Sequence, residues 1–272
     1  MADGRAPVEA AIVEGAIAIA HDAAAAILAV YAQAFEVVAK ADASPVTAAD
    51  LAAHHVIVDG LRRLTPGIPV LSEEATDAVP TAERRAWTRM WLVDPLDGTR
   101  EFVKRNGEFS VNLALIDDDG VAVFGVIQAP VTGTVWYGMP GVGAFRRDGG
   151  VETAIRARPV AGRGAALRVA ASRSHRDPRT AALLARLGDI EPRPLGSSLK
   201  FCRLAEGALD VYPRFGPTCE WDTAAGQAIL EAAGGALFDP DGRPFRYNRR
   251  ETLRNGDFVA LGDPDLPWRT WI

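Results

Sequence analysis

The first forty residues have apolar side chains at helical spacing. Between residues 8 and 40, small and large apolar positions recur every three to four residues, and this period predicts one long helix. A polar turn at residues 41–45 ends it. Thr47 is then a suitable N-cap for a second helix that runs through Leu61.

The middle of the chain consists of short apolar runs separated by turn residues. The runs cover residues 70–71, 90–93, 111–116, 121–127 and 135–137. Turn segments such as Asp118-Asp119-Gly120 and Thr132-Gly133 interrupt them. This punctuation favours an antiparallel meander of strands.

Beyond a loop at residues 158–164, the pattern changes to alternating strands and helices. Strands are expected at residues 167–171, 209–212 and 258–261, and helices at 179–187, 198–206 and 223–233. Alternation of this kind indicates layered α/β construction. We therefore divide the chain near residue 160. Residues 1–160 form an N-terminal α+β region with the long helices and the antiparallel sheet, and residues 161–272 form a C-terminal α/β region.

Composition and charge narrow the class of protein. The chain has 272 residues, of which 48% are hydrophobic, enough for one large core or two modest ones. Its formal net charge of −5 argues against a nucleic-acid polymer as partner, because neutralising phosphates needs a basic surface. Only Cys202 and Cys219 could pair, so nothing indicates an oxidising compartment.

The apolar N-terminal stretch is not expected to cross a membrane. Residues 16–39 are dominated by alanine and include His21, Asp22 and Glu36, whereas a spanning helix needs about 20 strongly apolar residues. The segment before it is acidic and lacks the basic start of a signal peptide. We expect a cytoplasmic protein. Peripheral attachment to the inner face of the cell membrane stays open, as does the choice between monomer and homodimer.

Two aspartates follow the predicted strand at residues 90–93, in the segment Asp94-Pro-Leu-Asp97-Gly-Thr99. Proline cannot continue a strand ladder, so the chain turns where both acids emerge, and they can converge on one point. Gly98 allows close approach of the backbone, and the amides after it are suited to hold a phosphate. Two convergent carboxylates with backbone and water oxygens suit Mg²⁺.

This segment also has other interpretations. Asp94 is in the position of a simple turn cap, as aspartates before proline often are. A covalent aspartyl-phosphate phosphatase is a further alternative, but its acids usually stand at alternate positions, whereas Asp94 and Asp97 are three positions apart.

Three further acidic segments strengthen the metal interpretation. Glu73 and Glu74 end a short apolar strand. Asp222 stands at the start of a helix, where the dipole favours an anion. Asp50 lies about one turn into the second predicted helix. Taken singly, Glu73 and Glu74 are also explained as a solvated strand end, Asp222 as a helix cap and Asp50 as a solvated helix position. For Glu74 we prefer the solvated strand end.

Together these segments resemble the inositol monophosphatase superfamily of metal-dependent, lithium-sensitive phosphatases. Asp94-Pro-Leu-Asp97-Gly-Thr99 matches its first signature, and Trp221-Asp222-Thr-Ala-Ala-Gly226 matches its second. The resemblance runs from about residue 41 to residue 261. It implies an α+β fold, a layered αβαβα sandwich in which helix pairs and sheets alternate.

Within that superfamily the chain is similar to bacterial 3'(2'),5'-bisphosphate nucleotidases. The segments typical of that branch are residues 94–112, Ser172-Arg-Ser-His175, Gly196-Ser-Ser-Leu-Lys-Phe201 and Tyr212-Pro-Arg214-Phe-Gly-Pro217. The resemblance implies a phosphoric monoester hydrolase that converts 3'-phosphoadenosine 5'-phosphate, a by-product of sulfate assimilation, to AMP and phosphate. The corresponding phosphosulfate is a plausible second substrate.

The resemblance also implies roles for single residues. The ligands of two or three Mg²⁺ ions would be the side chains of Glu73, Asp94, Asp97 and Asp222 and the backbone carbonyl of Leu96. Thr99 and Asp50 would orient and deprotonate the attacking water. The amides of Gly98 and Thr99 would hold the scissile phosphate, and Asp222 would also lie near the leaving sugar oxygen.

The nucleotide contacts rest on fewer residues. The positions that match are His175, Ser197, Lys200 and Arg214, which complete a substrate-binding set with Glu73, Leu96, Asp97, Gly98, Thr99 and Asp222. Lys200 and Arg214 carry positive charge suited to the second, non-scissile phosphate. Arg100, Lys104 and Arg105 form a basic strip suited to steering anions, or in part an ordinary exposed face.

Two other functions stay open at this point. A phosphatase of the same fold for inositol phosphate or fructose 1,6-bisphosphate would share every metal motif, although residues 196–201 and 212–217 favour a nucleotide. A non-catalytic regulator that binds metal or phosphate would be expected to lack a ligand or the Thr99 and Asp50 pair, and all are present. Cys219 and Glu220 receive no role.

Overall fold

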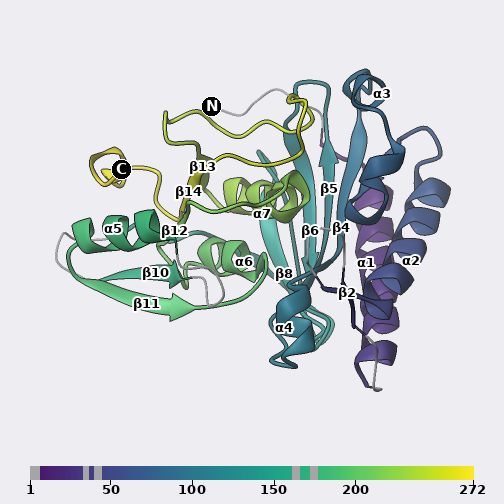
Figure 1. Ribbon diagram of the computed structural model, residues 1–272, viewed down its shortest axis with the longest axis horizontal. Helices are drawn as coiled ribbons and strands as arrows, with labels where there is room; N and C mark the ends of the chain where they lie inside the picture. The colour runs from purple at the N-terminus through teal and green to yellow at the C-terminus, as the bar shows by residue number, and fades with distance from the viewer. Residues whose placement is uncertain (1–6, 33–36, 40–44, 161–165, 172–176) are drawn as a thin grey trace.

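Two helices form the first layer of the molecule. The computed structural model describes residues 7–32, 37–39, 45–160, 166–171 and 177–272. The first layer consists of α1 (Ala10–Tyr31) and α2 (Ala48–Leu64), which pack on each other and on the large sheet (Figure 1). Small residues of α1 such as Ala16 and Ala20 are fully buried in this contact region.

The long N-terminal helix is shorter than its apolar period predicts. It ends at Tyr31, and residues predicted as helix form β1 (Val37–Ala39), which pairs antiparallel with β2 (Pro45–Thr47). Two of the three residues of β1 are β-branched valines, which favour strand pairing when a partner is available. The second helix starts at Ala48, directly after Thr47, as predicted, and extends to Leu64. Most of the predicted turn at residues 41–45 lies outside the described residues.

A large sheet forms the second layer, and it contains the predicted meander. Its strands are β3 (Val70–Ser72), β4 (Met90–Asp97), β5 (Ser110–Ile116), β6 (Ala122–Gln128), β7 (Val135–Met139), β8 (Gly143–Asp148) and β9 (Val151–Ile155), in that spatial order. β3 is parallel to β4, and each later pair is antiparallel. Neither β8 nor β9 was predicted, because their residues are largely polar or exposed and lack a continuous apolar run.

The remaining layers come from the C-terminal region. In the middle layer, α6 (Leu199–Ala205) and α7 (Glu220–Ala232) pack on each other, and α7 lies against β5 and β6. The second sheet has the order β11 (Ile190–Pro194), β10 (Leu167–Ala171), β12 (Val211–Arg214), β14 (Phe258–Leu261) and β13 (Ala236–Phe238). Leu183 of α5 (Pro178–Arg186) joins a core cluster on this second sheet. The αβαβα sandwich is therefore confirmed (Figure 1).

The C-terminal strands and helices deviate from the prediction mainly at their ends. The edge strands β11 and β13 were not predicted; β11 contains two prolines, which are tolerated at a sheet edge. The helix predicted from residue 223 begins three residues earlier, at Glu220. The two sheets lie on either side of residue 160, but α7 packs on the N-terminal sheet and gives both regions a shared core. The division into two regions stays an interpretation.

Short helices complete the described elements of the fold. They are η1 (Glu73–Ala78), α3 (Thr81–Arg85), α4 (Thr99–Val103) and η2 (Trp268–Thr270). Of the helices in the described ranges, only α1 is long and apolar enough to cross a membrane by length and composition. Its Ala16, Ala20 and Ile27 are fully buried in the core that it shares with α2 and the sheet, which is the pattern of a core helix.

Candidate active site

The carboxyl end of β4 brings two aspartates to one edge of the sheet. Asp94 pairs with Asn112 of β5, whereas Asp97 pairs with Ser110, so the register shifts between the two acids. Such an irregularity re-aims side chains, and Pro95 removes a donor from the ladder there. The Leu96 amide donates to Asp94 Oδ1 at 3.1 Å, which fixes that carboxylate against its own turn. Gly98 then adopts a φ of +89°, and α4 begins.

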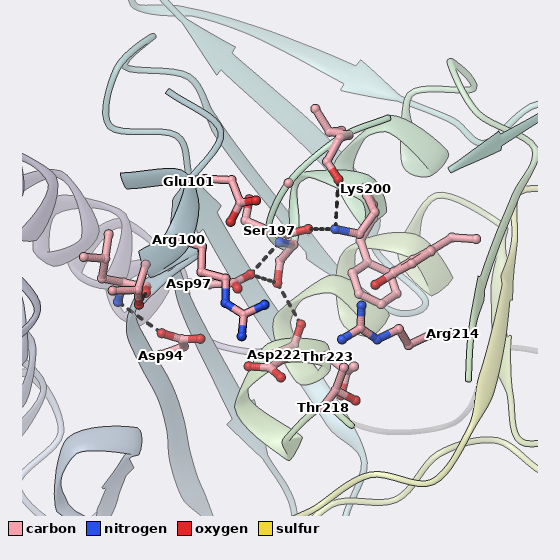
Figure 2. Close-up of a pocket in the computed structure, with 18 of the residues that line it drawn as sticks. Asp94, Asp97, Arg100, Glu101, Ser197, Lys200, Arg214, Thr218, Asp222 and Thr223 are labelled. Atoms are coloured by element: carbon pink, nitrogen blue, oxygen red, sulfur yellow. Dashed lines mark hydrogen bonds between the residues drawn. The ribbon is translucent and has the colours of Figure 1, made fainter. Parts of the chain in front are cut away.

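Carboxylates from three separate elements meet in one cavity. Oxygens of Asp94, Asp97 and Asp222 lie within 4.8 Å of one another, and Figure 2 shows these residues around the same space. Glu73, at the start of η1, lines the same cavity, as does Leu96. The cavity has a volume of about 260 Å³. The residues Glu73, Asp94, Asp97 and Asp222 are hereafter called the carboxylate side of the cavity.

The carboxylate side holds more negative charge than its surroundings can easily accommodate. Burial raises the pKa of Asp94 well above its usual range, and the charges of Glu73, Asp97, Asp222 and Asp50 raise it further. Burial, followed by the charges of Asp97 and Glu73, raises the pKa of Asp222 to about 8. Buried acids that repel each other in this way need a cation to be ionised together at neutral pH.

The donor set fits a hard divalent cation. Every side chain on the carboxylate side offers oxygen, the atom that Mg²⁺ prefers. The cluster has neither imidazole nor thiolate among its three closest members, which would indicate a softer metal. A second group of acids, Asp117, Asp118 and Asp119, lies in the turn between β5 and β6 and is partly exposed. The Asp117 carboxylate accepts hydrogen bonds from the amides of Asp119 and Val121. These hydrogen bonds stabilise the turn, so the presence of the acids there is explained without a metal.

Asp97 is held by residues outside the predicted set of site residues. Its Oδ2 accepts from the Ser198 amide at 2.5 Å and lies 2.6 Å from the Ser198 hydroxyl. Asn112 Nδ2 approaches the same oxygen at 3.4 Å and donates to the Ser198 hydroxyl at 2.9 Å. From the Gly196-Ser-Ser segment, the sequence led us to select Ser197. Ser197 and Ser198 are adjacent and identical in type, so only their contacts in the fold distinguish them.

Positively charged side chains line another part of the cavity. Arg100, Lys200 and Arg214, here called the cation side, belong to its lining, and Figure 2 shows both guanidinium groups directed into the cavity. The Lys200 ammonium donates to the Ser197 carbonyl at 2.6 Å and to the Leu195 carbonyl at 3.3 Å. Burial lowers the pKa of Lys200 to about 8. This cation is therefore poised to lose its charge in mildly alkaline solution when the site holds no anion.

The other predicted residues are distributed unevenly around the cavity. Gly98, Thr99 and Ser197 line it, and the Thr99 hydroxyl lies 3.4 Å from the Leu96 carbonyl. Asp50 is buried and its charge reaches Asp94, but it does not belong to the cavity lining. His175 lies outside the described residues.

The predicted basic strip divides into two sections. Arg100 lines the cavity, whereas Lys104 and Arg105 do not. The Arg105 guanidinium lies 4.5 Å from the ring centre of Tyr31 and hydrogen-bonds its carbonyl. Arg105 therefore packs on α1 from an exposed position, in agreement with the interpretation of part of the strip as an ordinary exposed face. A role of the strip in steering anions stays a prediction.

Cys219 and Glu220 have structural positions at the start of α7. Cys219 is its N-cap: its side chain accepts from the Asp222 amide, and its own amide donates to Asp222 Oδ2 at 2.7 Å. Burial raises the pKa of the Cys219 thiol to about 12, which favours the neutral thiol at neutral pH. Glu220 is fully buried and accepts from the Asn248 amide at 2.7 Å and from Arg250 at 2.8 Å. Glu220 thus ties the start of α7 to the C-terminal segment.

Comparison with known proteins agrees with this architecture. The inositol monophosphatase family model matches residues 9–260. The 3'(2'),5'-bisphosphate nucleotidase CysQ of Escherichia coli O157:H7 is 50% identical over 245 residues, which cover 88% of this chain and 95% of that protein. The nucleotidase of the same name from Aggregatibacter actinomycetemcomitans is 38% identical, over 94% of this chain and 95% of its own.

The fold comparison leads to the same group. The crystal structure of CysQ from Bacteroides thetaiotaomicron, described as a bacterial member of the inositol monophosphatase family, superposes with a TM-score of 0.78. It is 42% identical, and the match covers 91% of this chain and 96% of that one. The chain belongs to the inositol monophosphatase family, a family of metal-dependent phosphatases.

Proposed function

We propose that this protein is a Mg²⁺-dependent 3'(2'),5'-bisphosphate nucleotidase that hydrolyses 3'-phosphoadenosine 5'-phosphate to AMP and phosphate. The observation that carries the proposal is a single cavity with a carboxylate side and a cation side. The carboxylate side suits a metal-assisted phosphoryl transfer, and the cation side suits a second anionic group on the same substrate. The relatives of 50% and 38% identity, both named as nucleotidases of this kind, support the nucleotide as that substrate.

In this proposal the metal ligands are Glu73, Asp94, Asp97, Asp222 and the Leu96 carbonyl. These residues would hold two or three Mg²⁺ ions, which would supply charge withdrawal from the phosphoryl and leaving oxygens and a lower pKa of the attacking water. A cation would favour the ionised forms of Asp94 and Asp222, because burial and the neighbouring acids raise the pKa of both. Metal binding therefore releases protons and completes the site in one event.

The chain's own residues orient the reactants for in-line attack. Asp50 and Thr99 orient the water, and Asp50 accepts its proton as the new oxygen–phosphorus bond forms. The amides of Gly98 and Thr99 hold the scissile 3'-phosphate. Gly98 is required at φ +89°, where a Cβ would also lie only 3.2 Å from the Glu108 carbonyl. The bond to the 3'-oxygen breaks on the opposite side, near Asp222, and the leaving oxygen takes up a proton.

The cation side selects the substrate. Lys200 and Arg214 bind the non-scissile 5'-phosphate, while His175 and Ser197 contact the nucleoside. 3'-Phosphoadenosine 5'-phosphosulfate, which has the same two anionic ends, is a second substrate under this proposal. We place the reaction in the cytoplasm, where sulfate assimilation produces the nucleotide, and we expect no nucleic-acid polymer as partner because the chain has a net charge of −5.

The test is phosphate release from a small substrate panel with Mg²⁺. The panel contains 3'-phosphoadenosine 5'-phosphate, inositol 1-phosphate and fructose 1,6-bisphosphate, each with and without lithium. We expect the nucleotide to be preferred by two or more decades in kcat/KM, about 2.7 kcal/mol of transition-state discrimination, and lithium to inhibit. A preference for inositol phosphate would contradict the substrate assignment but keep the metal ligands. No turnover of any member would contradict the catalytic proposal itself.

A further inference from the structure

Ser198 lies where three separate elements of the fold meet. It precedes α6 and is almost fully buried. Its hydroxyl is 2.6 Å from Oδ2 of Asp97 at the end of β4, 2.7 Å from the backbone carbonyl of Asp222 in α7, and 2.9 Å from Asn112 Nδ2 on β5. One buried hydroxyl therefore contacts the elements that carry two of the proposed metal ligands.

The hydrogen-bond roles of this hydroxyl follow from its atoms. Asn112 Nδ2 can only donate, so the Ser198 oxygen accepts from it and uses its single hydrogen toward Asp97 or toward the Asp222 carbonyl. Ser110 donates to Asn112 Oδ1 at 3.1 Å, which keeps the Asn112 amide group facing Ser198. The Ser198 amide donates to the same Asp97 oxygen at 2.5 Å. Oδ2 of Asp97 is thus engaged in hydrogen bonds within the protein, and in our inference Oδ1 is the oxygen that binds the metal.

The hydrogen bonds of Ser198 oppose the electrostatic repulsion between the carboxylates of Asp97 and Asp222. Asp97 and Asp222 come from different halves of the chain, and oxygens of their two carboxylates lie within 4.8 Å of each other. Without a cation or a fixed contact, two such carboxylates would turn away from each other. A donor that holds Asp97 and also contacts the backbone beside Asp222 keeps both near ligand distance. Such outer-shell partners commonly change metal affinity by about 10–100-fold.

We infer that Ser198 is a positioning residue that presets the spacing and orientation of Asp97 and Asp222 for metal binding. This inference rests on the proposed metal ligands of the preceding section, and it adds a residue outside the proposed sets of metal ligands and substrate contacts. It also distinguishes Ser198 from Ser197: both line the cavity, but the hydrogen bonds to Asp97 come from the Ser198 amide and hydroxyl, whereas Ser197 has a left-handed backbone at φ +46°.

The experiment measures Mn²⁺ binding to the metal-free, full-length protein by electron paramagnetic resonance, together with its melting temperature. Ser198→Ala is compared with the wild type and with Thr65→Val. Thr65 is a matched control because its buried hydroxyl accepts from Trp91 Nε1 at 2.9 Å but lies outside the cavity lining. Ser198→Thr, which retains the hydroxyl, serves as the conservative variant.

We expect Ser198→Ala to weaken Mn²⁺ binding at least tenfold, Thr65→Val to leave it unchanged, and Ser198→Thr to recover most of the loss. Unchanged Mn²⁺ affinity in Ser198→Ala, with or without a lower melting temperature, would overturn the inference. If Ser198→Ala does not fold, Asn112→Ala decides: a smaller loss of Mn²⁺ affinity supports the inference, and wild-type affinity overturns it. A wild type that binds no Mn²⁺ would overturn the proposed metal site as well, so the two failures are distinguishable.

Discussion

The two sides of the cavity are built on different principles. The carboxylate side comes from the end of β4, the start of η1 and the start of α7. Its Asp94 is buried, its other acids are half-buried, and their charges oppose the ionisation of Asp94. The cation side uses long side chains from α4, α6 and β12, two of which are partly engaged with backbone carbonyls of their own loops. In the proposed function, short acidic side chains close to the backbone hold the metal, whereas long basic side chains that extend into the cavity bind the substrate. We therefore predict that substitutions on the carboxylate side lower turnover, whereas substitutions on the cation side raise KM.

The largest expected effect is on the carboxylate side. Asp97→Asn should reduce turnover by at least about a thousandfold, or about 4 kcal/mol, because it removes a ligand charge while keeping the side chain's shape. The metal-free protein should stay folded and melt no lower than the wild type, since one of the repelling charges is gone. Activity assays over a Mg²⁺ titration and thermal unfolding without metal measure the two outcomes. Near-normal activity at saturating Mg²⁺ would contradict the metal assignment of Asp97.

On the cation side, the expected effect is on substrate affinity. Lys200→Ala should raise the KM for the bisphosphorylated nucleotide more than for a monophosphate, by about 1.5–3 kcal/mol if a charged hydrogen bond is lost. Lys200→Met is the matched control for packing, because it keeps most of the side chain beside Tyr212 and removes only the charge. Both variants should shift KM alike. An equal effect on both substrates would remove Lys200 from the recognition of the second phosphate.

A smaller effect should appear in the pH dependence. Burial lowers the pKa of Lys200 to about 8, Asp97 opposes this shift, and Arg214 adds to it. As the pH rises through 8, the free protein loses this cation, so kcat/KM for the nucleotide should decline by up to about one log unit per pH unit. Lys200→Arg, which stays charged, should not show this decline. A decline of the same size in Lys200→Arg would assign it to another group.

The smallest effect is expected at Cys219, at the margin of the carboxylate side. Cys219→Ser keeps an N-cap acceptor for the Asp222 amide and removes a thiol whose pKa is already raised to about 12. Activity should stay within about twofold, and the unfolding free energy within about 0.5 kcal/mol, as for most substitutions that retain such a cap. Steady-state kinetics and chemical denaturation measure both quantities. A tenfold loss of activity would show that the thiol itself takes part.

The sequence was sufficient to predict those features that depend on a few neighbouring residues. Pro95 between two aspartates interrupts the strand ladder, which predicted that Asp94 and Asp97 converge. In the structure they do converge, but β4 continues to Asp97 with a register shift instead of turning at Pro95. The meander from β4 to β7 was equally predictable, because its strands are continuous apolar runs with turn residues between them.

Tertiary contacts decided the rest. The apolar period of the N-terminal helix continues past Tyr31, but residues 37–39 pair with residues 45–47 instead, and no local pattern indicates that partner. Ser197 and Ser198 are indistinguishable by composition, yet only Ser198 contacts Asp97, because β4 and α7 approach it from distant segments of the chain. The burial of Glu220 against Asn248 and Arg250 likewise depends on contacts across the fold. The sequence by itself determined which acidic groups we propose for the chemistry, because they stand in short local motifs. The packing of distant elements determined which groups hold them in place, because those contacts join segments far apart in the chain.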